Sequence, residues 1–321
     1  MLQPQTPTSR PLSAPLCCPD CHARLLPSGD DQAQADAIEG NEARASIVCS
    51  ACSRAFAVDG GIPRLIGKTS QLNASEVATQ DHVADQYDQV RYKRASSIKY
   101  HEDTMQQLIE LAAPRGTILD DGCGTGAFLE FVRRRALPVE RYVGIDVSGG
   151  MLAHAKRRLD ATGDDHVLAR ADACRLPFAA NTFDIVYARA LLHHLPEPAL
   201  GLGEIARVLK PGGLAVVLDP NKTLVSTLPR YLARRTDHFD ADHKNFRAEE
   251  IQRLVSQALN IDETRFFGYL AYPLLGFPDL IDFDRLGIGR LTDPLLALDR
   301  KLGTVPGLRR MGWGVMIRAH K

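Results

Sequence analysis

A glycine-rich turn preceded by acidic residues is the part of the sequence whose residue types point most directly to chemistry. The segment Thr117-Ile-Leu-Asp-Asp-Gly-Cys-Gly-Thr-Gly126 places three glycines, Gly122, Gly124 and Gly126, at alternate positions. Such glycines let the backbone turn tightly and approach a ligand that a Cβ atom would exclude. The apolar residues before the turn predict a buried strand, and those after it predict a helix. The turn is therefore expected at the carboxyl edge of a sheet, where open α/β folds bind nucleotide-like ligands.

The turn is compatible with two kinds of nucleotide-like ligand. From Gly122 to Ala127 it also fits the G-x-G-x-x-A pattern of dinucleotide-binding sites. Asp146 lies 20 residues after Gly126, at the end of the next predicted strand, where a carboxylate can bind a ribose diol in either case. Asp120 favours a different ligand, because a carboxylate inside the turn repels a pyrophosphate but attracts the ammonium group of an amino-acid moiety.

Alternating strand-like and helix-like segments predict the elements that position this turn. Strands are expected near residues 117–121, 141–146, 166–171, 183–188 and 213–219, and helices near 126–136, 149–161 and 199–210. A helix over 247–259, a sixth strand over 261–269 and a last strand over 313–319 follow. This alternation predicts an α/β fold with a parallel sheet and helices on both of its faces.

Several further motifs follow the turn in order. The set comprises Leu119-Asp-Asp-Gly-Cys-Gly-Thr-Gly126, Val143-Gly-Ile-Asp-Val-Ser148, Ala171-Asp-Ala173 with Leu176-Pro-Phe178, Phe183-Asp-Ile-Val-Tyr187, Leu192-His-His-Leu195 and Val208-Leu-Lys-Pro-Gly-Gly-Leu214. With these motifs, residues 80–320 resemble a class I S-adenosylmethionine-dependent methyltransferase. The resemblance implies a Rossmann-like sheet of seven mostly parallel strands, in which the last strand pairs antiparallel beside the sixth.

The resemblance also implies which residues bind S-adenosylmethionine. They are Asp120, Gly122, Gly124, Asp146, Val147, Asp172, Ala173 and Arg189. Asp120 would hold the amino group, the glycines would give backbone access, and Asp146 would accept hydrogen bonds from both ribose hydroxyls. Val147 would stack on adenine, Asp172 and Ala173 would bind its polar edge, and Arg189 would line the cavity near the methionine end. Asp121 departs from the family, which usually has an apolar residue there, and this puts the packing of the first strand in question.

Two histidines after the fourth predicted strand, His193 and His194, are the candidate catalytic residues. A histidine titrates near neutrality and can take a proton from an acceptor hydroxyl or an acidic carbon. In the resembled family this stretch also shapes the cavity without taking part in the chemistry. His238 and His243 are a second pair of candidates, with a solvated loop as the alternative. The segment Tyr187-Ala-Arg-Ala190 lacks the Asn/Asp-Pro-Pro-aromatic tetrad of enzymes that methylate exocyclic amines of nucleobases.

Four cysteines occur as two C-x-x-C pairs, Cys18 with Cys21 and Cys49 with Cys52. Two such pairs can form a closed tetrahedral Cys₄ site for a structural zinc ion. Residues 16–67 resemble the zinc ribbons of tRNA methyltransferase activators and of ribosomal RNA guanine methyltransferases. The 27 residues between the pairs make a long gap, which a polar loop over 28–45 would fill. Cys17 is interpreted as a spare thiol, and two simple redox pairs are the alternative.

The remaining segments suggest the organisation of the chain. Residues 1–15 are expected to be a disordered lead, and residues 70–115 a helical cap with helices over 76–92 and 101–112. Tyr87 or Tyr92 would shield the cofactor or only pack the cap. Residues 116–321 form the expected catalytic domain. Its apolar, proline-punctuated insert over 270–310 would be a lid, a homodimer contact, a membrane-surface patch or internal packing.

Composition limits the possible functions. Lysine plus arginine equals aspartate plus glutamate, 39 each, so charge gives no general attraction to nucleic acid. The chain shows neither an apolar run long enough for a membrane span nor an export signal, which predicts a cytoplasmic protein. A methyltransferase acting on O, C or N of a small-molecule or lipid-like acceptor is favoured. An RNA methyltransferase that uses the ribbon to dock RNA and a non-catalytic cofactor-binding regulator are the alternatives.

Overall fold

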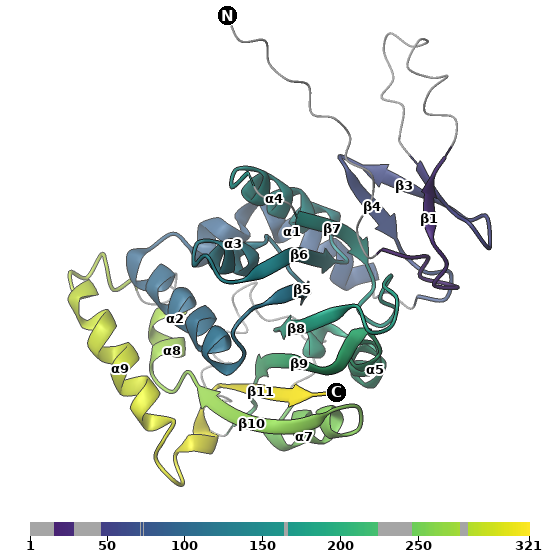
Figure 1. The fold of residues 1–321 in the computed structure, drawn as a ribbon. Coiled ribbons are helices and arrows are strands. Elements are labelled where there is room, and N and C mark those ends of the chain that lie inside the picture. Colours follow the sequence, from purple (N-terminus) through teal and green to yellow (C-terminus); the bar gives the residue numbers. More distant parts are fainter. Residues whose placement is uncertain are drawn as a thin grey trace, which may run out of the picture.

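The computed structural model describes residues 16–28, 46–70, 72, 74–163, 166–223, 246–276 and 282–321 (Figure 1). The predicted disordered lead, most of the predicted polar loop over 28–45, and His238 and His243 lie outside these residues. Residues 277–281 of the insert also lie outside them. Within the described parts, no helix combines the length and the apolar composition needed to cross a membrane.

A seven-stranded sheet forms the centre of the molecule, as predicted. Its order is β7 (His166–Ala171), β6 (Val139–Asp146), β5 (Gly116–Asp121), β8 (Phe183–Arg189), β9 (Leu209–Pro220), β11 (Gly314–His320) and β10 (Asn260–Phe267). Neighbouring strands from β7 to β9 pair in parallel. The last strand, β11, is antiparallel to both β9 and β10. The crossover between β5 and β8 brings the carboxyl ends of the central strands to one edge, where ligand sites of such sheets form.

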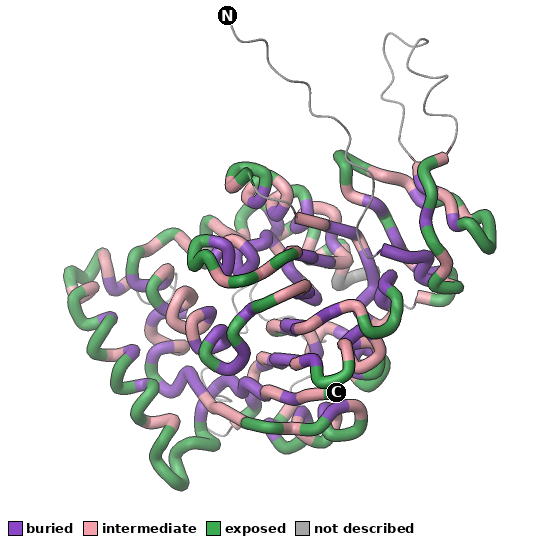
Figure 2. The backbone as a smooth tube through the Cα atoms, in the orientation of Figure 1, coloured by how far each residue is buried: buried purple, intermediate pink, exposed green. Residues whose placement is uncertain are grey.

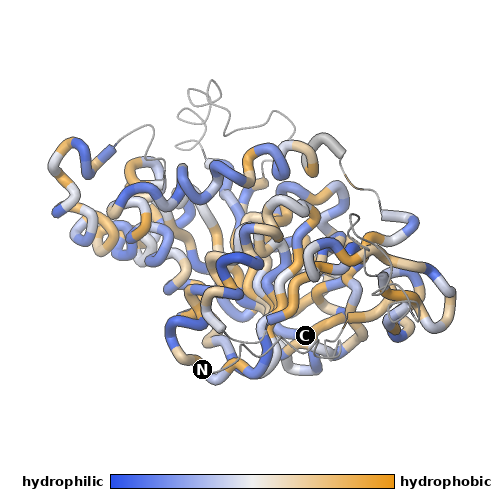
Figure 3. Tube along the Cα trace, turned by 90° about the horizontal axis from the view of Figure 1, so that it is seen from above, coloured by the Kyte–Doolittle hydropathy of each residue, from blue (hydrophilic) through white to orange (hydrophobic). Residues whose placement is uncertain are grey.

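Helices cover both faces of this sheet. One core joins β5 and β8 to α2 (Ala95–Leu111), α3 (Ala127–Arg133) and α4 (Gly149–Asp160). The other core joins the opposite face to α5 (Pro198–Val208) and α7 (Ala248–Ser256). Figure 2 shows the central strands largely buried, and Figure 3 shows apolar residues along them. The alternation of side chains along each strand thus fills two apolar layers.

Several helix boundaries differ from the predicted ones. The helices expected near 126–136 and over 247–259 end at Arg133 and Ser256. The helix expected over 199–210 ends at Val208, and Leu209 already begins β9. Pro211 explains the earlier end, because the residue before a proline disfavours helical backbone angles. The second cap helix, α2, begins at Ala95, before the expected position 101. Ser96 there donates its backbone N–H to Asp284, which lies 188 positions away along the chain.

The N-terminal residues 16–67, here called the cysteine module, form four short strands. Strands β1 (Leu25–Pro27), β2 (Ser46–Cys49), β3 (Ala55–Asp59) and β4 (Ile62–Leu65) pair antiparallel in sequence. Strand β4 also pairs in parallel with the edge strand β7, so that Leu65 lies opposite Ala171. The sequence did not predict this pairing. The module therefore extends the central sheet and shares its core through Leu16, Phe56 and Leu65.

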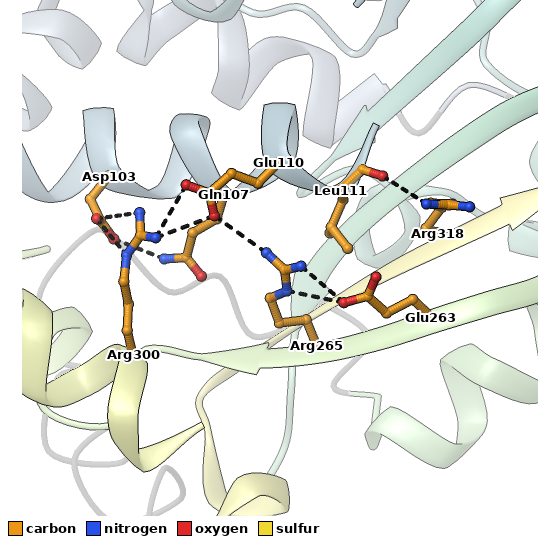
Figure 4. Close-up of polar contacts among 8 residues, drawn as sticks. All are labelled: Asp103, Gln107, Glu110, Leu111, Glu263, Arg265, Arg300 and Arg318. Carbon is orange, nitrogen blue, oxygen red and sulfur yellow. Dashed lines mark hydrogen bonds and ion pairs between the residues drawn. The ribbon is translucent and has the colours of Figure 1, made fainter. Parts of the chain in front are cut away.

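Part of the insert packs internally. Helices α8 (Ala271–Leu275) and α9 (Thr292–Leu302) lie against α2, around a small core that includes Tyr100, Phe283 and Leu296. Arg300 of α9 forms ion pairs with Asp103 and Glu110 of α2 at 2.7 and 3.2 Å (Figure 4). These contacts fix α9 against the helical cap.

Candidate active site

The glycine turn adopts the tight geometry that its sequence predicts. Gly122, Gly124 and Gly126 all have positive φ angles, of 77°, 53° and 75°. The backbone N–H groups of Gly122 and Cys123 donate to Ile145 O at 3.0 and 2.8 Å, which holds the turn against β6. A Cβ atom at Gly126 would come within 3.2 Å of the Ala155 backbone. At Gly124 it would meet nothing within 4 Å, so this glycine borders open space where a ligand can approach.

Asp146 connects the glycine turn to the end of β6. Its two carboxylate oxygens accept hydrogen bonds from the backbone N–H groups of Gly124 and Ser148, each at 2.9 Å. Burial raises the pKa of Asp146, while the N–H groups of Ser148 and Gly124 oppose that rise. Each carboxylate oxygen has two lone-pair sites, so Asp146 retains capacity for ribose hydroxyls. Val147 follows, and its carbonyl accepts a hydrogen bond from Arg170 at 2.8 Å.

Asp120 and Arg189 form a buried ion pair across β5 and β8. The guanidinium donates from Nε and Nη2 to the two carboxylate oxygens at 3.1 and 3.0 Å. Burial raises the pKa of Asp120, and the charge of Arg189 opposes this rise. The resemblance placed both residues near the methionine end of the cofactor, and the structure brings them together. Because Arg189 already neutralises the carboxylate, an amino group would meet a paired Asp120 and not an isolated charge.

The loop after β7 contains the residues expected at the adenine. Asp172 is buried, and its carboxylate accepts a hydrogen bond from the Cys174 N–H at 2.8 Å. Ala173 is also buried beside it. Asp172 thus also fixes the local turn, a role that short acidic side chains often have.

The cap helix α1 (Ala74–Arg91) reaches the same edge of the sheet. Asp81 accepts hydrogen bonds from Ser148 Oγ at 2.5 Å and from Gly150 N at 2.9 Å, at the start of α4. Asp88 accepts one from Thr125 Oγ1 within the glycine turn at 2.8 Å. Sequence reasoning missed these contacts, since acidic residues on a polar helix carry no local signal of their partners.

Beyond α1, aromatic side chains continue from the cap toward the insert. The Arg91 guanidinium lies 4.6 Å from the centre of the Tyr87 ring, and the rings of Tyr92 and His101 are 5.2 Å apart. Burial lowers the pKa of His101 to about 3, helped by the positive charges of Arg91 and Arg189. His101 is therefore neutral at physiological pH. Whether Tyr87 or Tyr92 shields a cofactor stays a prediction.

His193 is held by a carboxylate that the sequence analysis missed. Its Nδ1 is hydrogen-bonded to Asp219 at the end of β9, and Asp219 is fully buried. The other Asp219 oxygen accepts the Leu192 N–H at 3.0 Å. Leu191 packs beside Gly122, so the short helix Leu192–His194 adjoins the glycine turn. Asp219 lies near the end of an apolar strand, so its place at the carboxyl edge was predictable, but its pairing with His193 was not.

His194 lies beside His193, at the end of the same short helix. The two imidazole rings are 4.0 Å apart and inclined by 38°. The Asp219 carboxylate fixes the ring orientation and tautomer of His193, as second partners of catalytic histidines do.

Comparison with known proteins identifies the domain that carries this site. A family model described as a methyltransferase domain matches residues 119–217. The ubiquinone/menaquinone biosynthesis C-methyltransferase UbiE of Desulfotalea psychrophila is 37% identical over 122 residues, which cover 37% of this chain and 48% of that protein. The demethylmenaquinone methyltransferase of Symbiobacterium thermophilum is 33% identical over 146 residues, covering 44% and 57%. The chain thus spans about half the length of these curated relatives.

Solved structures agree on the fold. A chain from the complex of the Haloferax volcanii Trm112 methyltransferase activator superposes with a TM-score of 0.52 and 20% identity, covering 75% of this chain and 96% of that one. A SAM-dependent methyltransferase from Thermotoga maritima gives 0.53 and 17%, covering 77% and 99%. The chain contains a class I S-adenosylmethionine-dependent methyltransferase domain.

Asp121 is the position at which this methyltransferase domain departs from its family, and the structure shows the consequence. The side chain is fully buried, and neither carboxylate oxygen has a hydrogen-bond partner among the described residues. Burial raises the pKa of Asp121 well above its usual value, and the negative charges of Asp120 and Asp172 raise it further.

The four paired cysteines come together in the cysteine module. Their sulfur atoms all lie within 4.8 Å of one another. The residues after each pair, His22 and Ser53, have similar positive φ angles of 57° and 56°, so the two turns have matching shapes. The Cys52 N–H donates to Cys49 Sγ at 3.4 Å and lowers the pKa of Cys49 to about 6. Cys17 is buried nearby but is not one of the four.

Proposed function

We propose that the protein transfers the methyl group of S-adenosylmethionine to a small apolar acceptor, at a carbon or oxygen from which His193 removes a proton. The hydrogen bond from His193 to the buried Asp219, beside the glycine turn, is the observation that carries the proposal. The names of the UbiE and demethylmenaquinone relatives support a quinone-like acceptor.

The residues at the carboxyl edge fit the cofactor. When bound, S-adenosylmethionine supplies an electrophilic methyl group on a sulfonium. Gly124 borders open space for the ligand, and Asp146 has lone pairs for the ribose. The Asp120 and Arg189 pair would orient the methionine carboxylate and amino groups. Asp172 and Ala173 would bind adenine, with Val147 against its ring. Because methyl transfer requires chiefly alignment, binding by these residues provides most of the catalysis.

His193 would act as the general base. Its Nδ1–H donates to Asp219, which places the basic lone pair on Nε2. The acceptor proton then moves to Nε2, and the resulting imidazolium is stabilised by the Asp219 carboxylate. The proton leaves to water after product release, which restores the neutral base.

Replacing His193 tests the proposal. We expect His193→Gln to lower kcat with a demethylated quinone by about 10² to 10⁴-fold, the usual contribution of a general base. Affinity for S-adenosylmethionine should be unchanged in calorimetric titration. His320→Gln is the matched control, because His320 also pairs with a carboxylate, Asp262 at 2.7 Å, but from the last residue of β11. Unchanged kcat in His193→Gln would contradict the assignment of the base.

We also propose that Cys18, Cys21, Cys49 and Cys52 bind one structural zinc ion. Four thiolates within 4.8 Å are a donor set that matches tetrahedral zinc and leaves no position for a catalytic water. The ion would cross-link the two turns of the cysteine module.

One observation favours RNA as a second candidate acceptor. A cavity of about 480 Å³ between the cysteine module and α4 is lined by four cationic residues, Arg64, Lys156, Arg157 and Arg170, which outnumber its two acidic ones, Asp59 and Asp160. Such side chains can contact phosphates, and binding would then weaken with salt. Tight, salt-dependent binding of RNA that is lost in Arg64→Gln/Arg157→Gln would favour this candidate over the apolar acceptor.

A further inference from the structure

Exposed apolar side chains are concentrated in the insert. Of the nine large apolar side chains that are exposed in the described parts of the chain, seven lie between residues 270 and 311. They are Leu270, Leu286, Leu291, Leu298, Val305, Leu308 and Met311. Single exposed apolar residues are ordinary, but a concentration in one segment indicates an interaction surface.

Helix α9 separates this surface from the core. Thr292, Leu296 and Asp299 are its buried residues and follow helical spacing. Leu291 and Leu298 are seven positions apart, so they share another face, and they are 47% and 45% exposed. Leu295 and Leu302 are partly buried at the border of this face, and Leu295 packs against the small core around Tyr100.

The opposite flank of α9 carries its ion pairs. Asp293 pairs with Lys99 at 2.7 Å, and Arg300 pairs with Asp103 at 2.7 Å. Asp293 and Arg300 are also seven positions apart and face α2, as Figure 4 shows for Arg300. Leu291 and Leu298 are therefore directed away from the ion-paired flank of α9.

Unpaired positive charge accompanies the apolar residues. Arg285, Arg290, Lys301 and Arg309 are exposed. Within the described residues, no ion pair involves any of the four side chains. The acidic residues of the segment are engaged: Asp282 with Arg94 at 2.7 Å, Asp284 with Ser96, and the buried Asp299 with three backbone N–H groups. The surface therefore has a net positive charge.

We propose that the exposed side of α9 with Leu291 and Leu298 docks on an anionic lipid bilayer, together with the exposed residues Leu286, Val305, Leu308 and Met311 of the flanking segments and the four unpaired cations. These residues are called the insert face. Apolar side chains would enter the headgroup boundary while the cations meet lipid phosphates. A second copy of the chain fits less well, because a two-fold contact would bring the same unpaired cations toward each other. This docking does not depend on the identity of the acceptor.

Vesicle sedimentation tests the proposal. The full chain is mixed with vesicles of phosphatidylcholine alone or of phosphatidylcholine with phosphatidylglycerol. We expect it to sediment with the second kind only, and less so as salt screens the charges. Neutralising Arg285 and Arg290 to Gln should lower the partition coefficient by about five-fold for each cation.

The apolar contribution is tested by Leu291→Ser/Leu298→Ser. We expect this variant to lose about ten-fold or more in partitioning, while its melting temperature and its affinity for S-adenosylmethionine stay unchanged. Leu200→Ser is the matched control, because Leu200 is 56% exposed but lies on α5. Equal partitioning of the double variant and the wild type would overturn the proposal, as would the absence of sedimentation with both kinds of vesicle. The proposal would also be overturned if the wild type is a dimer and the double variant is a monomer, since the insert face would then bind a second copy.

Discussion

Asp121 places a carboxyl group in a part of the core that is otherwise apolar. Its neighbour on the same side of β5, Leu119, packs in the core formed with α5 and α7. With both oxygens buried and unpartnered among the described residues, the ionised form would cost several kcal/mol. The raised pKa means that the side chain is held as a neutral acid, next to Asp120, one of the residues proposed to bind the cofactor.

This carboxyl group should make stability depend on pH. Because the pKa of Asp121 is raised in the folded state, its proton is kept on folding and lost on unfolding. The contribution of Asp121 to stability is therefore fully present below its unfolded pKa of about 4 and is lost as pH rises toward its folded pKa. We expect Asp121→Leu to raise the free energy of unfolding by about 1–3 kcal/mol at neutral pH, with a smaller gain at about pH 5. Urea unfolding at both pH values checks this, with the exposed Asp59→Asn as control. A gain independent of pH would argue against a buried acid.

Asp146 should control cofactor affinity. Asp146→Ala removes the acceptor of the Gly124 and Ser148 N–H groups together with the expected ribose contacts. We expect S-adenosylmethionine to bind about ten-fold more weakly or worse, which corresponds to about 1.4 kcal/mol. Calorimetric titration measures the change, and Asp160→Ala on the exposed end of α4 serves as the control. Normal affinity in Asp146→Ala would refute the ribose assignment.

The strands and helices of the methyltransferase domain were largely predictable from the sequence, because each is marked by its own apolar pattern and turn residues. The start of α2 was not, since the N–H group of its second residue, Ser96, is satisfied by Asp284 from the insert. Asp219 was missed as a partner of His193 because the contact joins separate segments. The pairing of β4 with β7 was missed for the same reason. Local patterns determine elements, whereas these contacts depend on how distant elements meet.

The fold of the two cysteine turns should depend on a bound zinc ion. We expect a strong chelator to release one zinc ion per chain and to unfold the cysteine module, as for other structural zinc sites. Cys49→Ser should reproduce this loss, whereas Cys17→Ser should keep the metal, because Cys17 is outside the group of four sulfur atoms. Metal analysis and hydrogen exchange of residues 46–67 measure the outcome. A metal-free wild type with protected β2 and β3 would refute the zinc site.

Loss of the zinc ion from the cysteine module should also affect the loop that carries Asp172, because the module contacts this loop directly. The Cys17 N–H donates to Pro177 O at 2.8 Å, and Asp20 accepts hydrogen bonds from Arg54 and from the Lys68 N–H. Asp20 also lies 3.5 Å from Arg175 of the loop. The cysteine module and the expected adenine site are thus joined by direct contacts.

At the scale of the whole chain, the cysteine module covers the edge strand β7 of the central sheet. Strand β4 pairs with β7, and Leu16, Phe56 and Leu65 belong to the same core as β5 and β8. A chain that begins at residue 70 would expose an edge strand and apolar surface, both of which promote aggregation. We expect it to melt at a lower temperature and to elute as aggregates in size-exclusion chromatography. A chain lacking only residues 1–15 should behave like the wild type. A monodisperse, equally stable shorter chain would show that the two parts are independent.

The parallel pairing of β4 with β7 also sets an order for folding during synthesis. Strands β1 to β3 can form as soon as they leave the ribosome, because their partners are near in sequence. Strand β4 reaches its partner β7 only after α1, α2, β5 and β6 have been made. Since contacts between distant segments slow folding, docking of the N-terminal module should be a late event. The cysteine module, which is translated before β7, would then be among the last parts to reach its native position.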